Sequence, residues 1–198
     1  RKGYSLSING QDQKALQYFK LATENDPGST TAWYGLGYCY AGKNSHKEAI
    51  AAYKQAIKTN PTNEMSHYHL GNYYSQIGRY DEAIASYQQV VALNPKFEAA
   101  YFNLGILLNK TGRYDEGRQA FESVIRINPQ AQKAYYNIGV TYTKLGRYEL
   151  AAMAYQKAID IQPEFPEAIF NLGVVYGELG KTEDEMKAQL LELGLTDA

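Results

Sequence analysis

The 198-residue chain carries 20 Lys and Arg against 21 Asp and Glu, a net charge of −1, and 44% of its residues are apolar. This balance gives no general attraction to nucleic-acid phosphates or to anionic lipid, so we expect no nucleic-acid partner. No run approaches 18 consecutive apolar residues, which argues against membrane insertion. The chain begins at Arg1 without a signal-peptide pattern, and we expect a fragment of a longer, cytoplasmic protein.

A period of 34 residues runs along the whole chain. Five of the six prolines follow it, at Pro27, Pro61, Pro95, Pro129 and Pro163. A glycine series keeps the same step, at Gly37, Gly71, Gly105, Gly139 and Gly173. Several independent series with one period predict stacked supersecondary units. The units are a partial repeat over 1–29, complete repeats over 30–63, 64–97, 98–131 and 132–165, and a degenerate last repeat over 166–198.

In chain order, the partial repeat comes first, and Ser29 then suits the N-cap of the next helix. Each complete repeat has a first helical face, a turn residue that tolerates left-handed backbone, and a second helical face that ends before proline. The turn residues are Asn44, Gly78, Gly112, Gly146 and Gly180. The last repeat breaks the pattern after Gly180, and its apolar residues predict a capping helix over 182–195.

Small residues predict how the two helices of a repeat meet. The Gly139 series lies on the first helix and the Ala151 series lies on the second, so the two backbones can approach closely. Large rings at the Tyr155 series are expected to fill the space beside this crossing. Gly117 replaces alanine in the second-helix series. We therefore predict that Gly117→Ala stabilises the protein, because alanine is the better helix former.

These positions resemble the tetratricopeptide repeat (TPR) family. The eight characteristic positions of one repeat are filled by Trp33, Leu36, Gly37, Tyr40, Ala49, Tyr53, Ala56 and Pro61. The resemblance implies an all-α, right-handed solenoid of antiparallel helix pairs, with about five to six 34-residue repeats. It also implies that the first helix of each repeat lines a concave groove.

Patterns of catalytic or cofactor chemistry are missing from the sequence. No phosphate-binding glycine loop and no nucleophile motif occurs, so we expect no enzyme activity and no cofactor. His67 and His69 are two residues apart on a predicted helix and point about 200° apart, so they cannot hold one metal ion from one face. His67 stands where other repeats have Trp33 or Tyr101, and we expect it to be packed. Cys39 is expected in the core.

One column of the first helices carries asparagine. Asn103, Asn137 and Asn171 are 34 residues apart, with His69 at the preceding position of the series. A primary amide can bind the N–H and C=O groups of an extended peptide whatever its side chains are. This column is locally similar to the asparagine ladder in the TPR superhelix of O-linked N-acetylglucosamine transferases. The alternative is that the amides bond within the repeat array.

A column of rings directly precedes the asparagine series. It contains Tyr34, Tyr68, Phe102, Tyr136 and Phe170. Rings that face a groove would bury apolar area against a bound peptide at low entropic cost. The alternative is that these rings pack against the adjacent repeat.

The sequence also resembles, in part, the TPR domains of co-chaperones that clamp a C-terminal carboxylate. Asn72, Asn103 and Lys133 match three positions of that clamp. Tyr68 and Asn137 stand where the family has cations, so we expect no high-affinity binding of an acidic tail.

We predict a non-catalytic scaffold that binds a partner protein or peptide segment in its groove. One alternative is the substrate-recruiting or regulatory arm of a larger enzyme, such as a glycosyltransferase. Another is self-assembly into homo-oligomers through the open solenoid ends.

Overall fold

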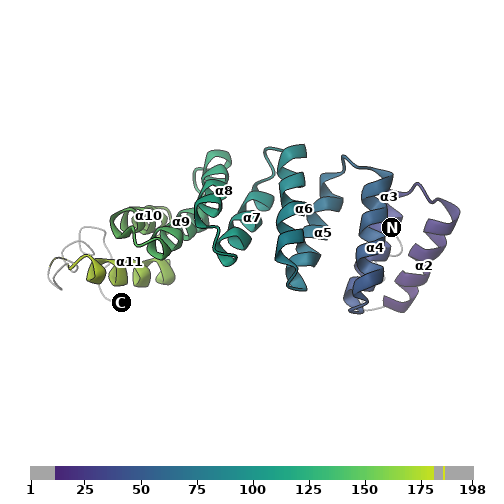
Figure 1. Cartoon of the computed structure of the whole chain (residues 1–198), viewed down its shortest axis with the longest axis horizontal. Helices are drawn as coiled ribbons and strands as arrows, with labels where there is room; N and C mark the ends of the chain where they lie inside the picture. The colour runs from purple at the N-terminus through teal and green to yellow at the C-terminus, as the bar shows by residue number, and fades with distance from the viewer. Residues whose placement is uncertain (1–11, 181–184, 186–198) are drawn as a thin grey trace. The chain divides into compact units, whose positions relative to one another are not determined.

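The computed structural model describes residues 12–180 and Glu185, and the chain forms two compact units, 1–95 and 96–198. The described residues form α-helices joined by short turns, and none of these helices has the length and apolar character needed to cross a membrane. Figure 1 shows the helices of each unit lying side by side. The prediction of an all-α repeat fold is confirmed over this part of the chain.

The first unit contains the partial repeat and two complete ones. Its helices are α2 (Asp12–Asn25), α3 (Thr30–Gly42), α4 (His46–Thr59), α5 (Glu64–Gln76) and α6 (Tyr80–Leu93). Helices α3 and α4 form one hairpin, and α5 and α6 form the next. Helix α2 packs on α3, and α4 packs on α5, so each repeat buries the apolar face of its neighbour.

The second unit contains two complete repeats and the start of another. Its helices are α7 (Glu98–Lys110), α8 (Tyr114–Ile127), α9 (Gln132–Lys144), α10 (Tyr148–Ile161) and α11 (Pro166–Glu178). The hairpins are α7 with α8 and α9 with α10, and α11 packs on α10. The predicted capping helix over 182–195 lies outside the described residues, apart from Glu185 in a helical position.

The helix ends follow the local chemistry of the sequence. The four turn glycines have φ between 68° and 79°, and Asn44 takes the same left-handed region with φ of 55°. Asparagine tolerates this conformation better than other non-glycine residues. At the other end, the Ser29 hydroxyl accepts a hydrogen bond from the Ala32 amide at 3.3 Å and caps α3 as predicted.

The glycine series lets an aromatic ring of the second helix lie against the first. A Cβ atom added to Gly37 would come within 2.8 Å of the Tyr53 ring, and one added to Gly139 within 2.6 Å of the Tyr155 ring. Both rings are almost fully buried. The ring therefore lies directly over the glycine, rather than beside the helix crossing as the sequence suggested.

The expectation for Gly117 meets a close contact in this geometry. A Cβ atom at Gly117 would lie 2.2 Å from Oδ1 of Asn109 and 3.2 Å from the carbonyl oxygen of Gly105. The Asn109 side chain reaches into the unit, where its Nδ2 donates to Thr141 Oγ1 at 2.6 Å. The space that an alanine methyl group needs is already filled by this amide.

Candidate functional site

The predicted groove residues of the second unit lie on α7, α9 and α11, and the structure brings neighbouring ones together. Phe102 and Asn103 of α7 line one pocket with Lys133 of α9. Further along, Nδ2 of Asn171 on α11 donates to the hydroxyl of Tyr136 on α9 at 3.1 Å. The first helices of this unit therefore share a face on which residues of adjacent repeats meet.

The asparagine column is partly engaged within the array. Nδ2 of Asn137 donates to the Lys133 carbonyl of its own helix at 2.7 Å, while Asn171 bonds Tyr136 of the preceding repeat. Asn103 is half-buried at the edge of its pocket. A primary amide offers two N–H groups and an oxygen, so one internal bond leaves capacity for a ligand. One N–H group of Asn137 and one of Asn171 therefore bond within the repeat array, as the alternative to peptide binding states.

The pocket between α7 and α9 has a volume of about 480 Å³. We call its apolar lining residues the floor, and they are Ala99, Phe102, Val124, Ala131 and Ala134. We call its polar lining residues the rim, and they are Glu98, Asn103, Asn128, Gln132 and Lys133. Nδ2 of Asn128 donates to Oε1 of Glu98 at 3.3 Å, which fixes one side of this rim. An apolar floor with a few polar groups at its edge is the usual composition of a binding pocket.

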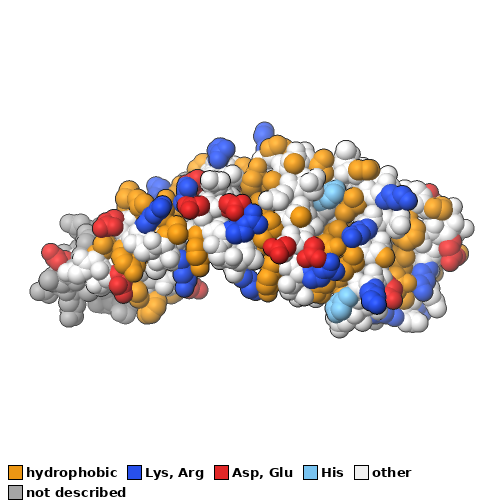
Figure 2. All heavy atoms as spheres, in the orientation of Figure 1, with side chains coloured by type: hydrophobic (Ala, Val, Ile, Leu, Met, Phe, Trp, Pro, Cys, Tyr) orange, Lys and Arg blue, Asp and Glu red, His pale blue; other side chains and the backbone are white. Residues whose placement is uncertain are grey.

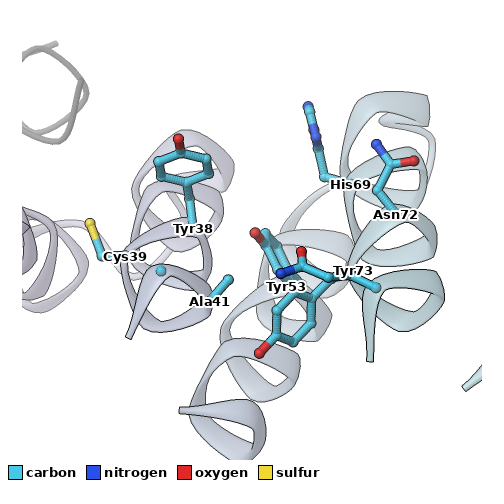
Figure 3. A pocket seen from close by; sticks show the side chains of 9 residues that line it. Tyr38, Cys39, Ala41, Tyr53, His69, Asn72 and Tyr73 are labelled. Atoms are coloured by element: carbon cyan, nitrogen blue, oxygen red, sulfur yellow. The ribbon is translucent and has the colours of Figure 1, made fainter. Parts of the chain in front are cut away.

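The first unit has a pocket of about 470 Å³ between α3 and α5. Figure 3 shows Tyr38 of α3 and His69 of α5 projecting from neighbouring helices, with Asn72 one turn beyond His69. The Tyr87 hydroxyl donates to Oδ1 of Asn72 at 2.7 Å and ties this amide to α6. Cys39 is buried against α2, in agreement with the prediction of a core cysteine.

The two histidines of α5 have different surroundings. His69 lies between two rings, with its centroid 4.5 Å from that of Tyr34 and 5.7 Å from that of Tyr68, and burial lowers its pKa. His67 Nε2 donates to the Pro61 carbonyl at 3.0 Å, as Trp33 Nε1 donates to the Pro27 carbonyl at 2.8 Å. His67 therefore makes the same hydrogen bond to a proline carbonyl as Trp33, from a half-buried position. Among the described residues, no group of three His, Cys, Asp or Glu could hold a metal ion.

The ring column is buried to very different degrees. Phe102 and Tyr136 are partly buried against Phe121 and Tyr155, whereas Phe170 is 71% exposed. Tyr68 packs against Tyr87 in the first unit. Packing within the array thus accounts for most of these rings, and Phe170 is the one with the largest surface for a partner.

Two features of this face escaped the sequence reasoning. One is an aliphatic series one turn beyond the asparagines, Ile106, Val140 and Val174, of which Ile106 and Val174 are 38% and 46% exposed. The other is Ala131, whose small side chain helps to open the α7/α9 pocket. For the aliphatic series the signal was the 34-residue period itself, applied to positions other than glycine, proline and asparagine.

The co-chaperone clamp pattern is divided between the units. Asn103 and Lys133 share the α7/α9 pocket, while Asn72 belongs to the first unit. Figure 2 shows one face of the molecule, on which cationic, anionic and apolar side chains are interspersed. This face carries no extended field of one sign that would attract a strongly charged partner.

Three regions of the chain match family models. Residues 30–63 and 68–132 match models described as "Tetratricopeptide repeat", and residues 141–180 match one described as "TPR repeat". No curated protein matches the chain. None of these comparisons bears on the similarity to the asparagine ladder of the glycosyltransferases, which stays a prediction.

Several solved structures resemble the chain. YrrB, described as "a TPR protein with an unusual peptide-binding site", is 32% identical, with a TM-score of 0.73 over 85% of this chain and 87% of YrrB. MamA is 26% identical, with a TM-score of 0.74 over 82% of this chain and 95% of MamA. A tetratricopeptide repeat protein from Parabacteroides merdae has a TM-score of 0.76 at 18% identity, over 96% of this chain and 77% of that one. This last likeness concerns the fold alone.

Proposed function

The chain belongs to the tetratricopeptide repeat family, and we propose that it is a non-catalytic scaffold that binds an extended segment of a partner protein. The binding face is the one formed by the first helices of the repeats. The observation that carries the proposal is the α7/α9 pocket, where Phe102, Asn103 and Lys133 line an apolar floor and a polar rim. The peptide-binding site in the description of YrrB supports the same reading.

The amides supply backbone recognition in this proposal. Asn103 and Asn137 occupy equivalent positions on α7 and α9, and no described residue bonds the side-chain oxygen of Asn137. An amide can pair with either group of a peptide unit, so such contacts tolerate different sequences. This use of the column is what the similarity to the glycosyltransferase ladder implies.

Amides alone do not give useful affinity. Two amide contacts contribute about 1–3 kcal/mol in total, whereas micromolar binding needs about 8 kcal/mol. The remainder must come from burial of apolar side chains of the partner. Exposed Phe170, Ile106 and Val174 offer apolar area on the first helices of the second unit.

The test starts from ligands selected with the full chain from a library of short unstructured peptides. Replacing Asn103 and Asn137 together with alanine should weaken binding of a selected peptide by about 5- to 150-fold, the equivalent of about 1–3 kcal/mol. The melting temperature should change little, because the helix propensity of alanine offsets the loss of the exposed Asn137 bond to the Lys133 carbonyl. Asn171 is left intact, since its loss would also remove the bond to Tyr136 and cost stability.

A matched control is Gln119→Ala, which removes an exposed amide from the second helix α8. It should leave both stability and affinity unchanged. The loss of affinity in the double variant should depend weakly on salt, because the substitutions remove no charge. If the double variant binds the selected peptides as tightly as the parent, recognition by the amides is rejected.

A further inference from the structure

Two successive repeats of the second unit share one polar framework. Nδ2 of Asn128, the residue that follows α8, donates to Oε1 of Glu98 on α7 at 3.3 Å. In the next repeat, Nε2 of Gln132 on α9 donates to Oε1 of Gln162, the residue that follows α10, at 3.2 Å. These pairs are 34 residues apart in sequence, so they occupy the same two positions of the repeat. The surfaces between α7 and α9 and between α9 and α11 can therefore be compared position by position.

The rings of these two surfaces also correspond. Phe102 of α7 packs on Phe121 with centroids 5.6 Å apart, and Tyr136 of α9 packs on Tyr155 with centroids 5.7 Å apart. Each first-helix ring is thus supported from one side by a buried ring of its own repeat. What differs is the group on the outer side of the ring.

That difference is one residue, the one that directly precedes the next first helix. Before α11 it is Phe165, whose ring lies against Tyr136 with a centroid distance of 5.1 Å. Before α9 it is Ala131, and the α7/α9 pocket of about 480 Å³ opens beside Phe102. The chain itself places an aromatic ring at this position in one repeat and leaves room for one in the other.

We propose that the α7/α9 pocket binds an aromatic side chain of the partner segment, with its ring against Phe102 as Phe165 lies against Tyr136. This inference rests on the proposed peptide-binding function and names the side chain that anchors the segment. Alanine methyl groups of Ala99, Ala131 and Ala134 line the pocket and offer apolar contacts to a flat ring. Aromatic pairs at such centroid distances are favourable beyond the area they bury.

The charges of the rim add a second element of specificity. Lys133 is exposed, and no ion pair among the described residues includes it. Glu98, the acidic residue of the rim, has its carboxylate bonded by Asn128. At the position of Lys133 the next repeat has Glu167, so the cation belongs to the open pocket only. The preferred anchor is therefore an aromatic residue with a carboxylate beside it.

The backbone conformation at residue 131 permits a variant that fills the pocket, Ala131→Phe. Ala131 has φ of −75° and ψ of 76°, and Phe97, at the same position one repeat earlier, has φ of −79° and ψ of 83°. Phenylalanine is therefore compatible with the conformation of residue 131. Ala131→Phe should place the protein's own ring in the pocket, as Phe165 already does before α11.

The experiment follows alanine methyl signals of the full chain by NMR during titration with three probes. N-acetylphenylalanine carries a ring and a carboxylate, N-acetylphenylalanine amide carries the ring alone, and N-acetylalanine carries the carboxylate alone. The two ring probes should shift the methyl signals of Ala99, Ala131 and Ala134, and N-acetylalanine should not. Ala168, the equivalent of Ala134 beside Phe165, is the internal control and should not shift.

Two variants then test the residues. In Ala131→Phe, N-acetylphenylalanine should bind at least tenfold more weakly, as followed at Ala99 and Ala134. In Lys133→Gln, the acid should lose its advantage over the amide while the ring still binds. Phe102→Leu is a second test in case Ala131→Phe unfolds. It keeps an apolar side chain at the floor and should also weaken binding of the ring probes.

The outcomes separate this inference from the proposed function. Ring probes that shift signals elsewhere, or that bind Ala131→Phe as well as the parent, overturn the pocket even where selected peptides bind. The aromatic pocket is also rejected if the selected peptides lack an aromatic residue and bind Ala131→Phe as tightly as the parent. Ring binding at Ala131 in a chain that selects no peptide supports the pocket and rejects the scaffold function.

Discussion

The two units of the chain are alike inside and different on the face of their first helices. In the first unit the ring of Tyr53 lies over Gly37, and in the second the ring of Tyr155 lies over Gly139. The exposed faces of the first helices, by contrast, differ between the two units. At equivalent positions, the first unit has His69 between tyrosine rings, whereas the second has asparagines.

This contrast separates what the repeat requires from what it leaves free. The glycine and its covering ring fix the distance between two helices, so a change there affects every contact of the hairpin. The residue at the position of His69 and Asn103 lies on the face of the first helices, outside the contact between the glycine and its covering ring. The period is therefore strict in the interior and permissive on the face.

The largest expected effect tests the shared interior. Gly139→Ala and Gly37→Ala each put a methyl group within 3 Å of a buried tyrosine ring. Each should lower the free energy of unfolding by about 3 kcal/mol, because a close-packed ring has little room to move. Urea unfolding followed by circular dichroism measures both.

Gly173 provides the matched control for these variants. It belongs to the same series, but no atom of the described residues lies within 4 Å of the position that its Cβ would occupy. Gly173→Ala should stabilise α11 by about 0.5–1 kcal/mol through helix propensity. Equal behaviour of Gly139→Ala and Gly173→Ala would show that the covering ring does not set the helix distance.

A smaller effect is expected at Gly117, where the second unit departs from its own pattern. Gly117→Ala should lower the free energy of unfolding by about 1–2 kcal/mol, because the new methyl group collides with the Asn109 amide. The amide is the end of a side chain and can move more easily than a buried ring. Its Oδ1 has no hydrogen-bond partner among the described residues, whereas Nδ2 of the same amide is bonded to Thr141.

The double variant Asn109→Ala with Gly117→Ala makes this prediction specific. Shortening Asn109 removes the collision, and alanine at 117 then gains its helix propensity. A double-mutant cycle should therefore give a favourable coupling of about 1–2 kcal/mol between the two sites. Additive effects of the two changes would mean that the amide and the glycine do not compete for space.

These cases show what the sequence could and could not predict. Helix boundaries followed from Gly146 and its equivalents, because a left-handed turn residue acts on its own neighbours. The close approach at Gly139 was also predictable from a repeated small residue. The conflict at Gly117 was not, since it depends on the direction of Asn109, a side chain eight residues away on another helix.

In the candidate site, too, some residues could be predicted from the sequence and others could not. The period placed Asn103 and Phe102 on the first helix, and Lys133 on the next, and the structure joins them in one pocket. Ala131 gave no signal, because a small residue at a variable position is informative only beside Phe165 in the adjacent repeat. The internal bonds of Asn137 and Asn171 were likewise invisible, since they depend on side-chain rotation.

The smallest effect concerns the face of the first unit and is tested with His69→Asn, which gives it the residue of the second unit. At pH 7 the free energy of unfolding of this variant should be about 0.5–1.5 kcal/mol below that of the parent, because asparagine cannot replace the ring contacts with Tyr34 and Tyr68. This difference in stability between the two proteins should shrink as the pH falls. Thermal unfolding of the two proteins between pH 8 and pH 5 measures it.

The sign follows from the environment of the imidazole. Burial lowers the pKa of His69 below its ordinary value of 6.5, and no described Asp, Glu, Lys or Arg lines either pocket that it touches. Below pH 6.5 the unfolded chain therefore binds a proton at this site more readily than the folded one, and the folded state loses stability. Asparagine does not titrate, so the variant escapes this loss. The difference should be constant between pH 7 and pH 8, and a difference that widens toward pH 5 would mean that the folded protein stabilises the charged ring.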